Sequence, residues 1–172
     1  MTSDQKDGSE NRAYLSLGSN MNDPAAMLRQ AIKRLNTVGI VRHVSSFYAT
    51  EPMEFAQQPW FMNCAVELCT TLDAKSLVHA LLGIEREMGR VRTRSKGPRI
   101  IDIDLLLFNE DLIDEPDVRV PHPAMQTRRF VLAPLAEIAP DAMHPRLRKT
   151  AIELLMALGP AGGTVHRVNI PA

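Results

Sequence analysis

Two aspartates one residue apart lie within a strongly apolar stretch that runs from Gly97 to Phe108. β-Branched and aliphatic residues on both sides predict a buried strand, in which Asp102 and Asp104 share one face. At about 3.3 Å per residue their Cα atoms are about 6.6 Å apart, so both carboxylates can reach one ion. Two like charges at the rim of an apolar strand are costly unless they share a proton or bind divalent cations.

A basic segment directly before the aspartates favours bound divalent cations over a shared proton. Residues 89 to 99 carry five cationic side chains in a stretch that contains Gly89 and Gly97. A loop of this kind beside two carboxylates suits a polyphosphate, because cations bind its oxygens while Mg²⁺ bridges carboxylate and phosphate. The ordinary alternative is a solvated basic loop beside two surface carboxylates, and the combination of the two features favours the ligand site over it.

The alternation of strand side chains divides the aliphatic residues of this stretch between two faces. One face is expected to hold Ile101, Ile103, Leu105 and Leu107. Leu106 and Phe108 are expected to follow the aspartates into the core on the other face.

Hydrophobic periodicity and capping residues predict the elements that position these groups. Strands are expected at residues 13–17, 41–50 and 61–69, and the Asp-x-Asp strand comes fourth. Helices are expected after Asp23 and Asp73, which are typical N-caps, and later at 128–138 and from Thr150 to Ala157. The order βαββαβ predicts an α+β, ferredoxin-like core, an antiparallel sheet with both helices packed on one face, plus C-terminal additions.

Length, charge and cysteine content narrow the class of protein. The chain has 172 residues, and its 20 basic and 20 acidic residues cancel, so no global field attracts nucleic acid or a membrane. We expect a disordered tail over 1–12, a single domain over 13–160 and a loose tail over 161–172. Cys64 and Cys69 are five apart in a predicted strand and would not bridge, which predicts a reduced, cytoplasmic protein.

Other residues suit a flat ligand. Phe61 and Asn63 share a face at the start of the third strand and place an aromatic plane beside an amide that donates and accepts. Such a pair suits a heterocycle with a mixed donor and acceptor edge, although a core aromatic and a turn amide are the commoner interpretation of each residue alone. Phe130 would supply a second stacking face. His122, between two prolines, suits a phosphate or nucleotide contact better than a metal site.

Several stretches of the chain occur in the order of a known family: 14–20, 45–50, Asn63, 97–106 and 120–123. Together they resemble the 6-hydroxymethyl-7,8-dihydropterin pyrophosphokinase family of folate biosynthesis, from about residue 13 to residue 140. The Gly-Pro-Arg-x-x-Asp-x-Asp core is far more specific than a bare Asp-x-Asp pair.

The resemblance implies a ferredoxin-like fold and the transfer of pyrophosphate from ATP to the pterin hydroxymethyl group, leaving AMP. The positions that it assigns to two Mg²⁺ ions are Asp102 and Asp104, and those that stabilise the transferring group are Arg90 and Arg99. Positions around the co-substrate ATP match Glu85, Arg92, Leu105, His122 and Arg128. The pterin pocket matches Thr50, Phe61, Asn63 and Phe130, with Phe61 and Phe130 as the two stacking faces.

The implied partners are ATP and the reduced pterin alcohol, with no nucleic acid and no membrane. Association with a neighbouring folate-pathway enzyme is also implied, since family members are sometimes fused to one. Two alternatives remain open: another two-metal phosphoryl or nucleotidyl transferase, and a non-catalytic ferredoxin-like module that binds a nucleotide through the basic loop. Phe61 and Asn63 discriminate, because only the pterin interpretation requires both to line one pocket beside the aspartates.

Overall fold

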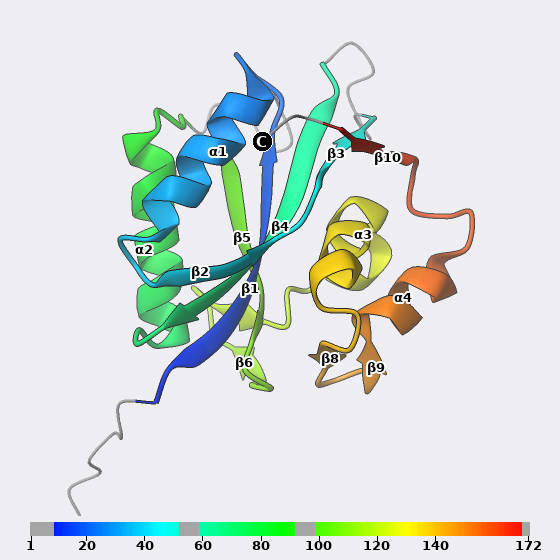
Figure 1. The fold of residues 1–172 in the computed structure, drawn as a ribbon. Helices are drawn as coiled ribbons and strands as arrows, with labels where there is room; N and C mark the ends of the chain where they lie inside the picture. Colours follow the sequence, from blue (N-terminus) through cyan, green and yellow to red (C-terminus); the bar gives the residue numbers. More distant parts are fainter. Residues whose placement is uncertain (1–8, 52–58, 92–98, 170–172) are drawn as a thin grey trace, which may run out of the picture.

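The computed structural model describes residues 9–51, 59–91 and 99–169 (Figure 1). Its main sheet contains β1 (Asn11–Ser19), β2 (Ile40–Val44), β3 (Phe47–Thr50), β4 (Phe61–Thr70), β5 (Asp102–Phe108) and β10 (Val165–Val168). The strand order is β10-β3-β4-β1-β5, β2 also pairs with β4, and every pairing is antiparallel. The predicted ferredoxin-like core is confirmed by this order, in which β1 and β4 are central and β5 is an edge strand.

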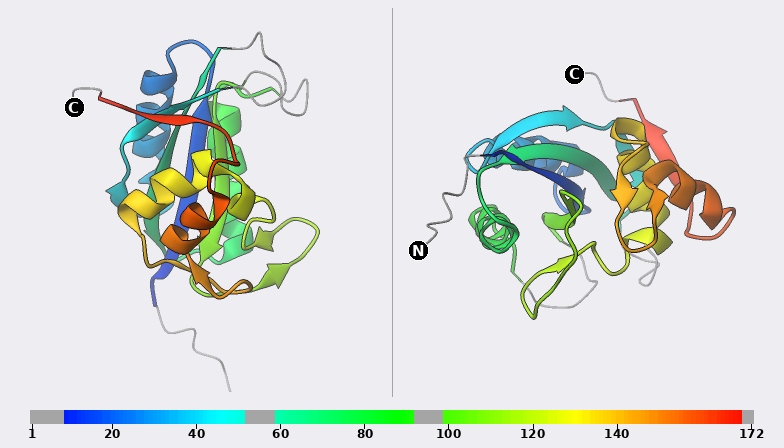
Figure 2. Two further views of the ribbon diagram at one scale, coloured as in Figure 1. Left: turned by 90° about the vertical axis from the view of Figure 1, so that its right-hand side faces the viewer. Right: turned by 90° about the horizontal axis from the view of Figure 1, so that it is seen from below.

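The helices lie on both faces of the sheet (Figures 1 and 2). They are α1 (Pro24–Leu35), α2 (Ala74–Glu87), α3 (Arg129–Ile138) and α4 (Ala151–Leu158), with a 3₁₀ turn η1 at Met125–Thr127. The two helices of the core, α1 and α2, share one face, as predicted, and the C-terminal additions α3 and α4 cover the other. Two small hairpins complete the additions: β6 (Ile113–Asp114) with β7 (Arg119–Val120), and β8 (Met143–His144) with β9 (Lys149–Thr150).

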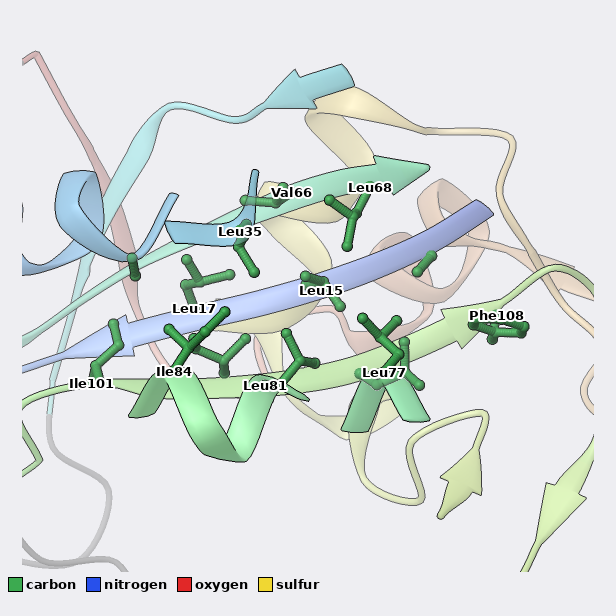
Figure 3. Packing of buried hydrophobic residues seen from close by; sticks show 14 of the residues in the cluster. Leu15, Leu17, Leu35, Val66, Leu68, Leu77, Leu81, Ile84, Ile101 and Phe108 are labelled. Atoms are coloured by element: carbon green, nitrogen blue, oxygen red, sulfur yellow. The ribbon is translucent and has the colours of Figure 1, made fainter. Parts of the chain in front are cut away.

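Two hydrophobic clusters correspond to these two faces. The first joins α1 and α2 to alternate residues of the central strands, such as Leu15, Leu17 and Val66, which are fully buried (Figure 3). The second joins α3 and α4 to residues of the opposite parity, such as Ala65. Because neighbouring residues of a strand point to opposite faces, the sheet is covered on both sides.

A register shift in β5 overturns part of the predicted alternation. Leu15 pairs with Leu105, but Tyr14 pairs with Leu107, so Leu106 is an extra residue in β5. After this bulge the faces are exchanged: Leu106 and Leu107 both join the second cluster, and Phe108 joins the first. The predictions for Leu107 and Phe108 were therefore wrong, because the sequence does not reveal the bulge.

The predicted helix starts are confirmed. The Asp23 side chain accepts a hydrogen bond from the Ala26 backbone at 3.2 Å, and the Asp73 side chain accepts one from Ser76 at 2.8 Å. Thr150 forms a reciprocal capping box with Glu153 at the start of α4. Each cap binds backbone N–H groups that a helix leaves without an internal partner.

Other boundaries differ from the prediction. The strand expected at 41–50 is divided at Ser45, whose Oγ accepts from the Ala65 backbone at 2.8 Å. β1 begins at Asn11, two residues before the predicted strand, and β10 lies within the segment 161–172 that was expected to be loose. Cys64 and Cys69 are free thiols. Within the described residues, none of the helices has the length and hydrophobicity needed to span a bilayer.

Candidate active site

One row of directly paired residues in the sheet, here called a rung, contains both a residue of the predicted pterin pocket and a residue of the predicted metal site. In the antiparallel register, Gly18 pairs with Asn63 on one side and with Asp102 on the other. Directly paired residues share a face, so Asn63 and Asp102 point to the same side of the sheet. That side is the one covered by α3, because Ala65, two residues beyond Asn63, lies in the second cluster.

Asp102 binds two arginines. Its Oδ1 accepts a hydrogen bond from Arg90 Nη1 at 2.8 Å, and its Oδ2 accepts one from Arg99 Nη1 at 2.7 Å. The same Nη1 of Arg90 also lies 2.7 Å from Glu85 Oε2. The structure therefore brings Glu85, Arg90, Arg99 and Asp102 into one network at the start of β5.

Glu85 reaches this network from the end of α2. Its Oε1 accepts a hydrogen bond from the Ile103 backbone at 2.7 Å, which satisfies an outward N–H of the edge strand β5. The residue is 2% exposed, and its burial raises the pKa of its carboxyl above the ordinary value, against the lowering effects of the Ile103 N–H and of Arg90. Its carboxylate supports β5 and Arg90, and a contact of Glu85 with ATP stays a prediction.

Asp104 lies one rung further along the same face, paired with Ser16. Burial, followed by repulsion from Asp102 and Glu85, raises the pKa of Asp104 to about 7, against the lowering effect of Arg128 and Arg99. The carboxylates of Glu85, Asp102 and Asp104 thus lie together at the sheet edge beside Arg90, Arg99 and Arg128, and the binding of a cation by the aspartates stays a prediction.

His122 and Arg128 lie near the aspartates on the C-terminal additions. The His122 backbone donates to Leu106 O at 2.9 Å, and its Nδ1 accepts from the Ala124 backbone at 3.2 Å. Burial, together with the charge of Arg128, lowers the pKa of His122 and favours the neutral ring at neutral pH. Because Nδ1 accepts from Ala124, Nε2 carries the proton of that neutral form. Arg128 Cζ lies 5.7 Å from the centre of the Phe130 ring.

The predicted pterin residues lie on the other side of Gly18. Asn63 Nδ2 donates to Thr50 Oγ1 at 2.9 Å, and both residues are buried. Thr50 and Phe130 line a cavity of about 220 Å³, together with Glu51 and residues 162–165. Phe61, the cross-strand partner of Thr50, and Asn63 are not among the described residues that line this cavity, so the prediction that both line one pocket stays a prediction.

One of the residues assigned to ATP does not join the site in the structure, and another lies outside the described residues. Leu105 belongs to the first hydrophobic cluster, with its side chain on the face opposite to the aspartates. Arg92 lies outside the described residues, as does Gly97. Their predicted contacts with ATP and the predicted hinge therefore stay predictions.

Sequence reasoning missed Asn20, which positions Arg99. Its Oδ1 accepts from the Arg99 backbone at 2.8 Å, and its own backbone N donates to Arg99 O at 3.1 Å. Its Nδ2 also lies 3.4 Å from Pro59 O. The sequence signal for this role is that Asn20 ends the first stretch, 14–20, that resembles the family.

Paired acids beside arginines, on a ferredoxin-like α+β fold, are typical of the class of phosphoryl transferases. The comparison with protein families names the particular family. The model of 7,8-dihydro-6-hydroxymethylpterin-pyrophosphokinase (HPPK) matches residues 14–140, and the chain belongs to this family.

Curated relatives agree with this assignment. The 2-amino-4-hydroxy-6-hydroxymethyldihydropteridine pyrophosphokinase of Methylorubrum extorquens is 43% identical over 92% of this chain and 99% of its own length. The protein of the same name from Bacillus subtilis is 46% identical over 74% of this chain and 78% of its own length. The Folic acid synthesis protein FOL1 of Dictyostelium discoideum is 37% identical over 98% of this chain, which spans only 26% of that longer protein.

Solved structures show the same fold. The wild-type HPPK-DHPS of Plasmodium falciparum, crystallised with pteroate, superposes with a TM-score of 0.70 over 87% of this chain and 42% of that chain. At 17% sequence identity this likeness supports the fold alone.

Proposed function

We propose that this chain transfers pyrophosphate from ATP to the hydroxymethyl group of 6-hydroxymethyl-7,8-dihydropterin and releases AMP, in folate biosynthesis. Membership of the family supports the reaction. The observation that carries the proposal is the shared rung of Asn63, Gly18 and Asp102. It aligns a heterocycle-binding amide with a phosphate-binding carboxylate on one rigid face. The shared rung places Asn63 and Asp102 on one face, as the pterin reaction requires, and membership of the family favours this reaction over another two-metal transferase or a non-catalytic nucleotide-binding module.

The two aspartates fit two Mg²⁺ ions bound together with ATP. Magnesium is commonly bound by one or two carboxylates, with substrate phosphates and waters as the remaining ligands. Within residues 9–51, 59–91 and 99–169 no cluster of three or more metal-binding side chains is present, so phosphate and water would complete the coordination. Each oxygen of Asp102 accepts one arginine N–H and keeps a second lone pair. Asp104 adds a carboxylate whose charged form is disfavoured by burial and by repulsion from Asp102 when no cation is bound.

Bound Mg²⁺ would supply charge neutralisation on the phosphate oxygens. Arg99 and Arg90 are held beside Asp102, where their guanidinium groups can bind the oxygens of the transferring group. Asn20 fixes the Arg99 backbone, and Glu85 fixes Arg90. Transfer to the β-phosphorus depends mainly on such positioning and electrostatic stabilisation.

His122, through its Nε2–H, and Arg128 would bind ATP on the side of the C-terminal additions. The neutral His122 ring offers one donor there, because its Nδ1 is engaged by Ala124. Thr50, Phe61, Asn63 and Phe130 would bind the pterin. Asn63 has an acceptor oxygen left for the heterocycle, since its Nδ2 donates to Thr50.

The compartment and the partners are also proposals. Free Cys64 and Cys69 support a reducing compartment such as the cytoplasm. This chain spans less than half the length of the HPPK-DHPS structure and of the FOL1 relative. Their additional length supports association of this chain with a second folate-pathway enzyme.

The test is incubation of the protein with Mg-ATP and the reduced pterin alcohol, followed by chromatography of the nucleotides. The proposal expects AMP and the pterin pyrophosphate in equal amounts. ADP as the only new nucleotide, or AMP that forms at the same rate without the pterin, would refute it.

A further inference from the structure

The chain after α4 returns to the pterin side of the sheet. Residues 159–168, here called the C-terminal strap, begin at Gly159 and end as β10, which pairs with β3 so that Val165 lies opposite Thr50. Three of its glycines have positive φ: Gly159 at 54°, Gly162 at 91° and Gly163 at 87°. These conformations favour glycine and let successive carbonyl groups turn toward one point.

That point is the guanidinium group of Arg129. Its Nε donates to Gly163 O at 3.1 Å, and its Nη2 donates to Ala161 O at 2.8 Å and also to Gly159 O. One half-buried arginine thus gathers three carbonyls of a loop that belongs to no helix or strand. A charged donor that bonds to several backbone oxygens strongly restricts the loop.

The strap segment that Arg129 holds is also part of the cavity wall. The cavity of about 220 Å³ is lined by Gly162, Gly163, Thr164 and Val165 of the strap together with Thr50, Glu51 and Phe130. This volume is smaller than that of typical drug-sized pockets, about 300–1,000 Å³, and suits one small ring system better than a nucleotide.

Three further contacts, made by Arg167 and His166, fix the end of the strap. Arg167 Nη2 lies 3.5 Å from Glu137 of α3, and Arg167 Nε donates to Ser46 Oγ at 2.8 Å. The His166 ring stacks on Trp60, with centroids 6.0 Å apart. The strap is therefore tied to the same helix, α3, that carries Phe130.

We propose that Arg129 is a positioning residue of the pterin pocket, which acts by holding residues 162–165 of the strap as part of the wall of the cavity that Thr50 and Phe130 also line. The inference rests on the proposed function. Arg128 and Arg129 divide two tasks at the start of α3: Arg128 lies near the aspartates and Phe130, and Arg129 binds the strap. Loss of the Arg129 donors loosens one wall of the pterin pocket and leaves the β5 network in place.

The test compares Arg129→Met, which keeps the apolar stem and removes the donors, with Arg129→Lys and with the control Arg146→Met at an exposed arginine. We expect Arg129→Met to raise the KM for the pterin about tenfold, because small displacements of positioning groups are costly. The KM for ATP and kcat should stay within about twofold of the unmutated protein, because Arg129 binds the strap and not the β5 network. A tenfold change corresponds to about 1.4 kcal/mol, which is well above a twofold spread. Arg129→Lys gives an intermediate pterin KM, and Arg146→Met gives no change.

A second readout does not depend on turnover. Trp60 is the only tryptophan of the chain, and its stack on His166 makes its fluorescence a reporter of the strap. We expect Arg129→Met to shift this emission without pterin present. Gly163→Ala is a second variant, since alanine disfavours the φ of 87° that orients the carbonyl bound by Arg129, and it should raise the same KM.

An unchanged pterin KM in folded Arg129→Met and Gly163→Ala overturns the inference, and so does an equal loss of ATP and pterin affinity. These outcomes are read against an unmutated protein that forms AMP. If the unmutated protein forms no AMP with the pterin, the proposed function fails first, and the strap inference fails with it.

Discussion

Asn63 and Asp102 lie on the same rung of the sheet, separated only by Gly18. With adjacent strands about 4.8 Å apart, their Cα atoms are roughly 10 Å from each other, and both side chains point to the α3 face. The spacing between the proposed pterin site and the proposed phosphate site is therefore set by hydrogen-bonded strands. A site built on strands is held more rigidly than one built on loops.

Gly18→Ala should impair pterin binding selectively. A Cβ at this position would lie 2.8 Å from Asn63 Oδ1, so the buried amide must move away from its hydrogen bond to Thr50. We expect a rise of about tenfold or more in the KM for the pterin, with a smaller change for ATP, measured by initial rates.

Gly83→Ala is the matched control for this substitution. Apart from its chain neighbours and the backbone of its own helix, no heavy atom lies within 4 Å of a Cβ at Gly83, which is inside α2, so the methyl group meets open space. Helix propensity predicts a gain in stability of about 0.5–1 kcal/mol and unchanged kinetics. If Gly18→Ala and Gly83→Ala behave alike toward the pterin, the proposed role of the Asn63 amide is wrong.

Arg90→Met should destabilise the protein more than Arg99→Met. Arg90 lies between Glu85 and Asp102 with its side chain 11% exposed, so its loss breaks the ion pair of the buried Glu85 carboxylate and leaves Asp102 paired with Arg99. Breaking such a buried pair typically costs about 3–5 kcal/mol. Arg99 is 24% exposed and pairs only with Asp102 in the described network, which predicts a loss of about 1 kcal/mol.

Both arginine variants should lower kcat by about 10²–10³, the typical effect of removing one electrostatic contact to the reacting group. Urea unfolding separates the structural effect from the kinetic one. A kcat close to that of the unmutated protein in Arg99→Met removes this residue from the mechanism.

Glu137 should make stability depend on pH in acid. Its burial favours the neutral form, but hydrogen bonds from Tyr48 at 2.5 Å and from the Ser46 backbone and hydroxyl at 3.0 and 2.8 Å outweigh it and lower the pKa of Glu137. A lowered folded-state pKa adds stability above the unfolded-state pKa, and this contribution is lost as pH falls through the folded-state value.

Glu137→Gln should therefore cost about 1–3 kcal/mol at pH 7, with a smaller difference from the unmutated protein below about pH 4. Urea unfolding at both pH values measures this, with the exposed Glu110→Gln as control. An equal difference at the two pH values would contradict the assignment.

The order of elements and the acidic pair could be predicted because their signals are local. Asp23, Asp73 and Thr150 each cap a helix as expected, since capping depends on residues three positions apart. Alternation placed Asp102 and Asp104 on one face correctly, because the bulge begins only beyond Leu105.

The rest depends on contacts between distant segments. The buried role of Glu85 arises because β5 is an edge strand with an outward N–H at Ile103, 18 residues away. Arg129 meets the strap about 30 residues later in the chain, through backbone carbonyls whose directions no side-chain pattern encodes. Family resemblance indicated which residues gather around the ligands, but not which of them support others.

The role of the acidic pair is tested most directly by the rate of AMP release by Asp104→Asn at saturating Mg-ATP and pterin, beside the exposed control Asp114→Asn. Asparagine keeps the shape of the side chain and removes the ionisable carboxyl. Burial and Asp102 raise the pKa of Asp104 because they disfavour its charged form, so stability should be maintained or increased. We predict a fall in turnover of at least about 10²–10³ with an intact fold, which added magnesium does not restore. Turnover close to that of the unmutated protein would contradict the proposal that the paired aspartates bind magnesium and the phosphates of ATP.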